Sequence, residues 1–163
     1  KYRENVKINL LHVQPEMPGY TPMDDLPEDY SIERAMEDGC VVIKNNRIIS
    51  ENKNALKEYF EKTENGENCS IRILIVYIDE NGEKLSYNIE DIEHREGKYI
   101  WCCDASRIDM NEEEKRKTRS YMIGEKFEFH EFKSKKDPNF HIEDYTIINE
   151  KDHTQTFIIV KVN

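Results

Sequence analysis

Histidine and cysteine are the residue types in this sequence that most readily carry metal or nucleophilic chemistry. The histidines are His12, His94, His130, His141 and His153, and the cysteines are Cys40, Cys69, Cys102 and Cys103. No two histidines have the close helical spacing of a metal-binding motif, and no Cys-x-x-Cys motif occurs. From these spacings we predict no metal site and no bound cofactor.

One combination of these residues could be catalytic. If the chain forms a β-meander here, His94 could approach Cys102 or Cys103, and a thiolate beside an imidazole is an activated nucleophile. The alternative is a solvent-facing loop histidine, because no third orienting group is indicated. The sequence contains no nucleophile elbow, HExxH motif, Walker loop or dinucleotide-binding glycine pattern. We therefore predict no catalytic residue and keep an enzyme that uses the His94 region as an alternative hypothesis.

The cysteines also bear on covalent stabilisation. Cys102 and Cys103 are adjacent, so on a strand their side chains point to opposite faces. One disulfide could join Cys40 or Cys69 to one member of this pair. Buried free thiols are the other interpretation, since free cysteine is a commonly buried residue type.

Aromatic residues give the candidate ligand-binding site. Trp101, Tyr99 and Tyr87 fall on neighbouring predicted strands. If these side chains are exposed, they form a patch of the kind that anchors binding partners. If they are buried, they belong to the core.

The central structural element is a predicted β-hairpin from Ile71 to Asp91. The Asn81-Gly82 pair favours a two-residue type I′ turn, in which both residues have positive φ. That turn places Leu74 opposite Ile89 and Arg72 opposite Asp91. The first strand is apolar on both faces and should lie inside a sheet, whereas the second, with Ser, Asn and Glu on one face, should be half-solvated.

Further helices and strands flank this hairpin. The predicted helices are 31–39, capped by Ser31, and 53–63, whose apolar stripe should cover Ile73 and Ile75. The other predicted strands are 40–43, 47–49, 98–103, 125–132, 145–148 and 156–162. The charge-dense residues 107–120 fit either an exposed helix or a mobile loop.

Composition excludes several classes of partner. The 163 residues carry a formal charge of −10, which argues against nucleic acid and anionic lipid, since both need a basic surface. Hydrophobic residues make up 37 % of the chain, enough for a folded domain rather than global disorder. No run of residues approaches the roughly 20 apolar residues of a membrane-spanning helix.

The N-terminal region has a different character. Four of the five prolines lie between residues 15 and 27, so we predict a linker or tether over residues 1–29 and a single domain over residues 30–163. The chain begins at Lys1, and Lys1-Tyr2-Arg3 would suit the flank of a removed anchor or signal segment.

From Tyr30 to about Ser106 the order of features resembles a family of small bacterial domains of unknown function, often found in lipoproteins and other exported proteins. The matching residues are Tyr30-Ser31, Ala35, Gly39, Val41-Val42, Leu56, Phe60 and Ser70-Ile71-Arg72-Ile73. This resemblance implies export and surface anchoring in a bacterium, with membrane attachment through an N-terminal anchor. It implies no activity.

Together these features predict an α+β domain, with a mostly antiparallel sheet built as a meander of hairpins and one or two short helices on one face. The expected function is an extracytoplasmic, non-enzymatic binding module for an unknown protein or small molecule. The alternatives are the enzyme described above and a cytoplasmic regulatory partner of a basic protein, attracted by the negative charge.

Overall fold

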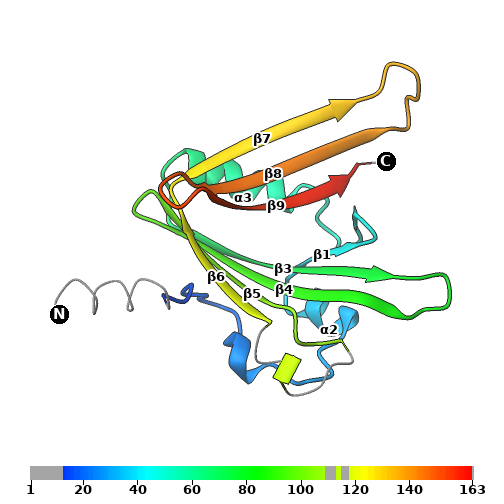
Figure 1. Cartoon of the computed structure of the whole chain (residues 1–163), viewed down its shortest axis with the longest axis horizontal. Helices are drawn as coiled ribbons and strands as arrows, with labels where there is room; N and C mark the ends of the chain where they lie inside the picture. Colours follow the sequence, from blue (N-terminus) through cyan, green and yellow to red (C-terminus); the bar gives the residue numbers. More distant parts are fainter. Residues whose placement is uncertain (1–12, 109–112, 115–117, 163) are drawn as a thin grey trace.

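The computed structural model describes residues 13–108, 113–114 and 118–162. In chain order the elements are η1 (Met23–Asp25), α2 (Ile32–Glu37), β1 (Val41–Lys44), β2 (Arg47–Ile48), α3 (Ala55–Glu64), β3 (Cys69–Ile78), β4 (Lys84–Arg95), β5 (Lys98–Asp104), β6 (Arg119–Gly124), β7 (Lys126–Lys133), β8 (His141–Asn149) and β9 (Thr154–Lys161). Within the described residues the strands form a six-stranded sheet, ordered β2-β1-β3-β4-β5-β6, and a three-stranded sheet, ordered β7-β8-β9. Figure 1 shows the smaller sheet stacked over one face of the larger one.

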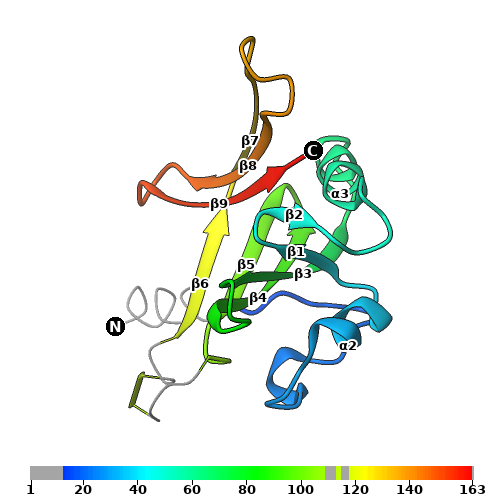
Figure 2. The same ribbon diagram turned by 90° about the vertical axis from the view of Figure 1, so that its right-hand side faces the viewer.

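The α+β class is confirmed, but the expected architecture needs three corrections. The larger sheet is mixed, because β1 runs parallel to β3, while the other strand pairs of this sheet are antiparallel. The strands divide into two sheets instead of one meander. The helices do not share a face, since α3 packs with the core between the sheets and α2 packs with the core on the opposite side (Figure 2).

The central hairpin has the predicted inner register. Arg72 pairs with Asp91 and Leu74 pairs with Ile89. The predicted burial of β3 on both faces is confirmed, because β1 and β4 flank it and its middle residues are buried. The prediction for β4 was wrong: β5 pairs with its other edge, and residues 89–94 are buried on both faces.

The turn of this hairpin differs from the predicted type I′ turn. Gly82 has φ +82°, but Asn81 is not among the residues with positive φ, and the register shifts between Tyr77 and Ile78. The Oδ1 atom of Asp79 accepts hydrogen bonds from the backbone N–H groups of Asn81 and Glu83, at 2.9 and 2.8 Å. This aspartate cap stabilises a wider turn, and Ile78 consequently pairs with Lys84 instead of Leu85.

Two other hairpins have the two-residue geometry. At Asn45-Asn46 both residues have positive φ, 48° and 65°, and Lys44 pairs with Arg47. At Glu96-Gly97 the φ angles are 51° and 75°, between β4 and β5. Asparagine and glycine tolerate this left-handed region, whereas Glu96 adopts it without that preference; each turn joins its two strands through two residues.

The two predicted helices are confirmed. Ser31 caps α2, and its Oγ accepts the N–H of Arg34 at 3.1 Å. In α3 the predicted stripe of Leu56, Tyr59 and Phe60 is buried. It packs in one cluster with Ile73 and Ile75, so α3 supplies the expected cover for β3.

The predicted linker is only partly described, since residues 1–12 lie outside the described part of the chain. Residues 13–29 pack against the larger sheet on the face opposite the smaller one (Figure 2). Met23 and Leu26 are buried there, and Arg72 donates to the backbone carbonyl of Thr21 at 2.7 Å. This part of the segment therefore belongs to the core and is not a free tether.

The strand β6 begins at the end of the region 107–120 that was predicted as helix or loop, and most of the strand lies beyond that region. It pairs with β5, and at Gly124 the chain turns out of the larger sheet into β7. A Cβ atom on Gly124 would lie 2.4 Å from Ile147 Cγ2 and 3.1 Å from the carbonyl oxygen of Ile148. Glycine is therefore needed for β6 to approach β8 at this corner. The rest of the charge-dense region is described only at 107–108, 113–114 and 118.

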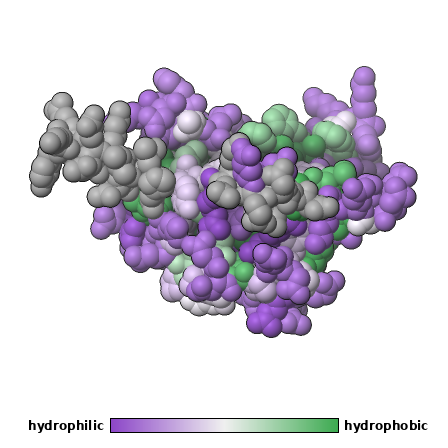
Figure 3. Space-filling model, turned by 60° about the horizontal axis from the view of Figure 1, so that its bottom comes forward, coloured by the Kyte–Doolittle hydropathy of each residue, from purple (hydrophilic) through white to green (hydrophobic). Residues whose placement is uncertain are grey.

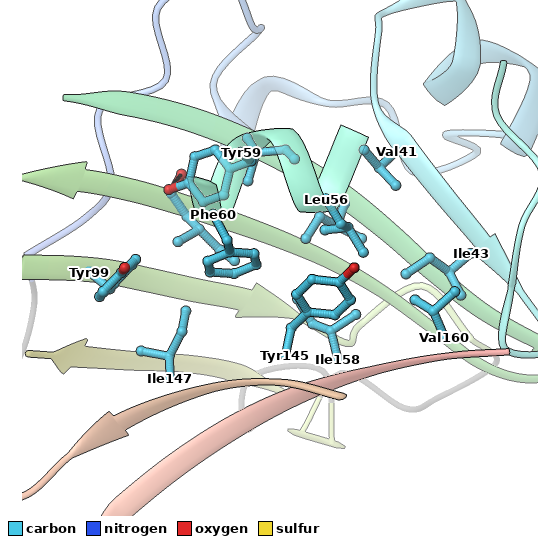
Figure 4. Close-up of a cluster of buried hydrophobic side chains, with 13 residues drawn as sticks. Val41, Ile43, Leu56, Tyr59, Phe60, Tyr99, Tyr145, Ile147, Ile158 and Val160 are labelled. Atoms are coloured by element: carbon cyan, nitrogen blue, oxygen red, sulfur yellow. Dashed lines mark hydrogen bonds between the residues drawn. The ribbon is translucent and has the colours of Figure 1, made fainter. Parts of the chain in front are cut away.

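The main core lies between the two sheets and α3. Figure 4 shows Leu56 and Phe60 from α3 turned toward Tyr145, Ile147, Ile158 and Val160 from the smaller sheet. The hydroxyl of Tyr59 instead donates to the backbone carbonyl of Ile92 in the larger sheet, at 3.3 Å. Ile158 and Val160 alternate on the buried face of β9, within the strand predicted at 156–162. Burial of this apolar surface joins the two sheets into one body.

The outer surface agrees with the high charge content. On the face shown in Figure 3 most residues are hydrophilic, and hydrophobic residues form separate patches between them. No helix of the described residues is long and apolar enough to cross a membrane.

Candidate binding groove and carboxylate–histidine cluster

A groove of about 400 Å³ lies between α3 and the strands β7 and β8. Its lining residues are Lys57, Phe60, Glu61, Glu64, Asn65, Phe127, Phe129 and Tyr145. We call the aromatic lining residues the floor of the groove, and the exposed Glu61 and Glu64 of α3 its rim. An apolar lining with a few polar groups is typical of a ligand site.

Stacked rings fix the shape of the floor. The rings of Phe60 and Phe127 are 4.1 Å apart and almost parallel, at 5°. Tyr145 lies 5.5 Å from Phe60 and 5.2 Å from Phe129. Phe129 is 40 % exposed, so one ring at the edge of this stack is open to a ligand.

The periodicity of two elements produces this arrangement. Phe127 and Phe129 are two residues apart on β7, so both point to the inner face, and Tyr145 lies opposite Phe129 in the register of β8. Phe60 belongs to the apolar stripe of α3, and Glu61 and Glu64 follow on the adjacent helical surface. The groove therefore lies where one face of β7 and β8 meets α3.

Lys57 links the groove to a neighbouring polar cluster. Its Nζ lies 2.7 Å from Glu143 Oε1 and 5.9 Å from the centre of the Phe129 ring. The hydrogen bond to Glu143 raises the pKa of the lysine. Lys57 is therefore held over the Phe129 ring as a cation.

The polar cluster contains Glu131, His141 and Glu143, on the inner face of β7 and β8. One ligating atom from each residue lies within 4.8 Å of the others. His141 Nε2 is 2.6 Å from Glu131 Oε1, and Lys133 Nζ is 3.0 Å from the same oxygen. The hydrogen bond from Lys133, and after it the one from His141, lower the pKa of Glu131, so Glu131 is a carboxylate at neutral pH.

Glu143 is the buried member of the cluster, at 6 % exposure. The hydroxyl of Tyr145 donates to its Oε2 at 2.5 Å. Burial, and then this hydrogen bond to Glu143, raise the pKa of Tyr145, so the tyrosine remains a donor. Both oxygens of Glu143 are thus oriented, one by Tyr145 and the other by Lys57.

The structure separates the three aromatic residues proposed from the sequence. Tyr87 and Tyr99 are buried, at 1 % and 4 %, in different core clusters on opposite faces of the larger sheet. Trp101 is half-buried beside the cluster that contains Tyr99, and its Nε1–H donates to Glu90 at 3.0 Å. These side chains do not form one exposed patch, and their burial agrees with the core interpretation.

The His94 and cysteine region is also divided. His94 Nδ1 contacts the backbone carbonyl of Glu67 at 2.7 Å, and His94 pairs with Tyr99, four positions along β5 from Cys103. Cys102 points to the other face of the sheet. Burial raises the pKa of both thiols, for Cys102 to about 11, which opposes thiolate formation. All four cysteines lie in the described part of the chain and are free thiols.

Sequence spacing did not indicate either the groove or the cluster. A strand was predicted at 125–132, but the partners of Phe127 and Phe129 on α3 are more than 60 positions away along the chain. Glu131 and His141 are brought together by the register of β7 and β8, which depends on a long connecting loop. The available signals were the Phe-x-Phe-x-Glu pattern of residues 127–131 and the His-x-Glu pattern of residues 141–143, and both are common in exposed strands.

Comparisons with known proteins do not add a family: no family model, curated protein or solved structure significantly matches this chain. The resemblance to exported bacterial domains therefore stays a prediction.

Proposed function

We propose that this protein is a non-enzymatic binding module whose ligand occupies the groove between α3 and β7–β8. The observation that carries the proposal is a space of about 400 Å³ lined by stacked aromatic rings, one of them, Phe129, 40 % exposed. A ring or an apolar side chain placed there would stack on Phe129 and lose contact with water.

Charge on the rim suggests the class of ligand. Glu61 and Glu64 lie on the rim, whereas the cation Lys57 is already paired with Glu143. A ligand with an apolar or aromatic body and a positively charged group would therefore fit best. Both small molecules and a basic side chain of a partner protein meet this description.

We also propose that the module acts outside the cytoplasm, attached to a membrane through an N-terminal anchor. The support is the resemblance to domains of exported bacterial proteins. Fractionation of cells that express the full-length gene would test this location, and recovery of the protein with the soluble cytoplasmic fraction would contradict it. A cytoplasmic role beside a basic protein is the alternative in that case.

The binding proposal can be tested with two probes that share a ring and differ in charge, 2-phenylethylamine and phenylacetate. Titration should be followed by amide chemical shifts in an NMR spectrum of the whole chain. We expect the amine to shift amides of α3 and β7 at millimolar concentration, and phenylacetate to shift them less. Absence of shifts at the groove with both probes would refute the proposal.

Two phenylalanines on β7 provide a matched pair of variants. Phe129 faces the groove, whereas Phe132 is 55 % exposed on the outer face of the same strand. Phe129→Ala should weaken binding of the amine about fivefold, because one aromatic contact contributes about 1 kcal/mol. Phe132→Ala should leave binding unchanged. Equal losses in both variants would show that the groove is not the site.

A further inference from the structure

We propose that Glu131, His141 and Glu143 together bind one divalent transition-metal ion of the zinc class. The inference does not depend on the ligand of the groove, since the donors lie on the hairpin of β7 and β8 beyond Tyr145. Within the described residues, these are the three histidine, cysteine or carboxylate side chains that lie close enough together to ligate one metal ion.

The positions of the donor atoms are the first argument for a metal site. Glu131 pairs directly with Glu143, and His141 pairs with Lys133, so the three ligands project from one face of a rigid two-stranded ribbon. Their donor atoms lie within 4.8 Å of one another. Zinc binds nitrogen and oxygen ligands at about 2.0–2.2 Å, so small side-chain rotations would enclose an ion. Glu131 is exposed enough to make that adjustment.

The charges of the two carboxylates are the second argument for a metal site. Two carboxylates directly opposite each other on a sheet repel unless a cation lies between them. Lys133 and Lys57 now balance Glu131 and Glu143 from outside the cluster. Their side chains are 64 % and 44 % exposed, so both ammonium groups can turn into solvent when a divalent ion enters.

The support of Glu143 resembles that of a metal ligand. Its carboxylate is buried, and the Tyr145 hydroxyl holds one oxygen at 2.5 Å. Such hydrogen bonds from outside the ligand set orient metal-binding carboxylates in proteins. The other oxygen is held by Lys57 at 2.7 Å, and a ligating atom of Glu143 lies within 4.8 Å of those of His141 and Glu131.

The donor set selects the type of ion. One imidazole and two carboxylates favour zinc or a similar first-row ion, whereas calcium and magnesium prefer oxygen ligands alone. Three protein ligands leave a fourth position for water or a ligand group. The ordinary alternative is a network of ion pairs that binds no metal.

A histidine on the outer face of β7 offers an internal control. His130 lies 3.9 Å from Glu128, and this pair lacks a third donor in the described residues. Both histidines are on the same hairpin, so substitutions at His130 and His141 report on the same fold. A metal site should respond only to His141.

The experiment is calorimetric titration of the whole chain with Zn²⁺, with Co²⁺ absorption as a second readout. We expect one ion per chain with micromolar affinity, and visible Co²⁺ bands of a four- or five-coordinate site. His141→Ala and Glu131→Gln should each weaken Zn²⁺ binding at least about tenfold, because each removes a ligand. His130→Ala should change the affinity less than about twofold.

The outcomes separate the proposal from the alternative. Absence of Zn²⁺ binding below millimolar concentration would overturn it, and so would equal losses from His130→Ala and His141→Ala. Circular dichroism of each variant shows whether the fold persists, and Glu131→Gln keeps the test usable if His141→Ala does not fold. None of these results depends on the phenylethylamine titration, so the two proposals fail separately.

Discussion

Arg72 and Asp91 face each other across β3 and β4 as a buried, two-pronged ion pair, with Nε–Oδ1 and Nη2–Oδ2 distances of 2.7 and 2.8 Å. The remaining guanidinium nitrogen donates to the backbone carbonyl of Thr21 at 2.7 Å. One side chain therefore joins the two central strands and also holds the N-terminal segment on the sheet. Each of its three nitrogens donates one hydrogen bond, and such pairing compensates the burial of its charge.

Replacing Arg72 should be strongly destabilising. Arg72→Met fills a similar volume but leaves Asp91 as an unpaired buried charge, so we expect a loss of about 3–5 kcal/mol in the free energy of unfolding. Urea denaturation followed by circular dichroism measures it. Arg34→Met is the matched control, because Arg34 pairs with Asp38 while 61 % exposed, and should cost less than about 1 kcal/mol.

The double variant Arg72→Met/Asp91→Leu separates the ion pair from the packing. Without either charge it should be more stable than Arg72→Met alone, since no unpaired carboxylate remains. The Thr21 carbonyl loses its donor in both, so limited proteolysis should cut within residues 13–29 faster in both than in the wild type. Equal stability of the single and double variants would show that the charge of Asp91 is not what makes the substitution costly.

Glu90 should make stability depend on pH. It is buried beside Trp101, and burial raises its pKa to about 7 despite the hydrogen bond from the indole. Because the folded-state pKa lies above the unfolded value of about 4.5, the folded protein holds the proton more tightly. The resulting stabilisation is fully present below pH 4.5 and is lost as the pH rises through 7, by about 3 kcal/mol in all.

The variant Glu90→Gln isolates this effect because it resembles the protonated acid and can still accept the Trp101 hydrogen bond. Urea denaturation of both proteins at pH 5, 6, 7 and 8 gives the comparison. The excess stability of the variant over the wild type should be smallest at pH 5 and should reach its full size by pH 8. Parallel stability curves across this range would contradict the assigned pKa.

The cysteines should differ in reactivity. Burial raises the pKa of all four thiols, but Cys69 is only half-buried, whereas Cys40, Cys102 and Cys103 are buried. With a maleimide at pH 8 we expect Cys69 to react first and Cys102 at least about 100-fold more slowly than a free cysteine, because little of it is thiolate. Cys69→Ser should remove the fast phase. Fast labelling of Cys102 or Cys103 in the folded protein would favour the thiol enzyme.

Local signals predicted the elements of this fold better than their assembly. The alternation around Leu74 and Ile89 was enough to predict the inner hairpin register, because a one-residue slip would expose the apolar face. The turn was mispredicted because Asp79 caps a wider loop, a contact that the Asn-Gly pair does not reveal. The two nearby Asn-Asn and Glu-Gly turns had no such competing cap.

Long-range pairing was not predictable in the same way. The prolines near Pro22 indicate extended chain, but extended chain fits a tether as well as a strap over a sheet. The burial of Glu90 depends on β5 and the second sheet, which a hairpin pattern does not contain. The groove and the Glu131–His141 contact likewise depend on how β7 and β8 fold back over α3.

The corner at Gly124 gives a last test of how the sheets are joined. In Gly124→Ala the new methyl group would overlap Ile147 Cγ2, at 2.4 Å, and crowd the carbonyl oxygen of Ile148, at 3.1 Å. The same carbonyl accepts the N–H of Glu125 at 3.1 Å, so β8 cannot withdraw without losing that bond. We expect a loss of about 1–3 kcal/mol in the free energy of unfolding, measured by urea denaturation.

Two further variants identify the cause of that loss. Ser120→Ala, at an exposed position on the same strand, should cost less than about 0.5 kcal/mol. Adding Gly124→Ala to Ile147→Ala should cost less than adding it to the wild type, because the shortened side chain leaves room for the methyl group. Strictly additive losses would mean that the two residues do not meet, and the close approach of β6 to β8 would then be wrong.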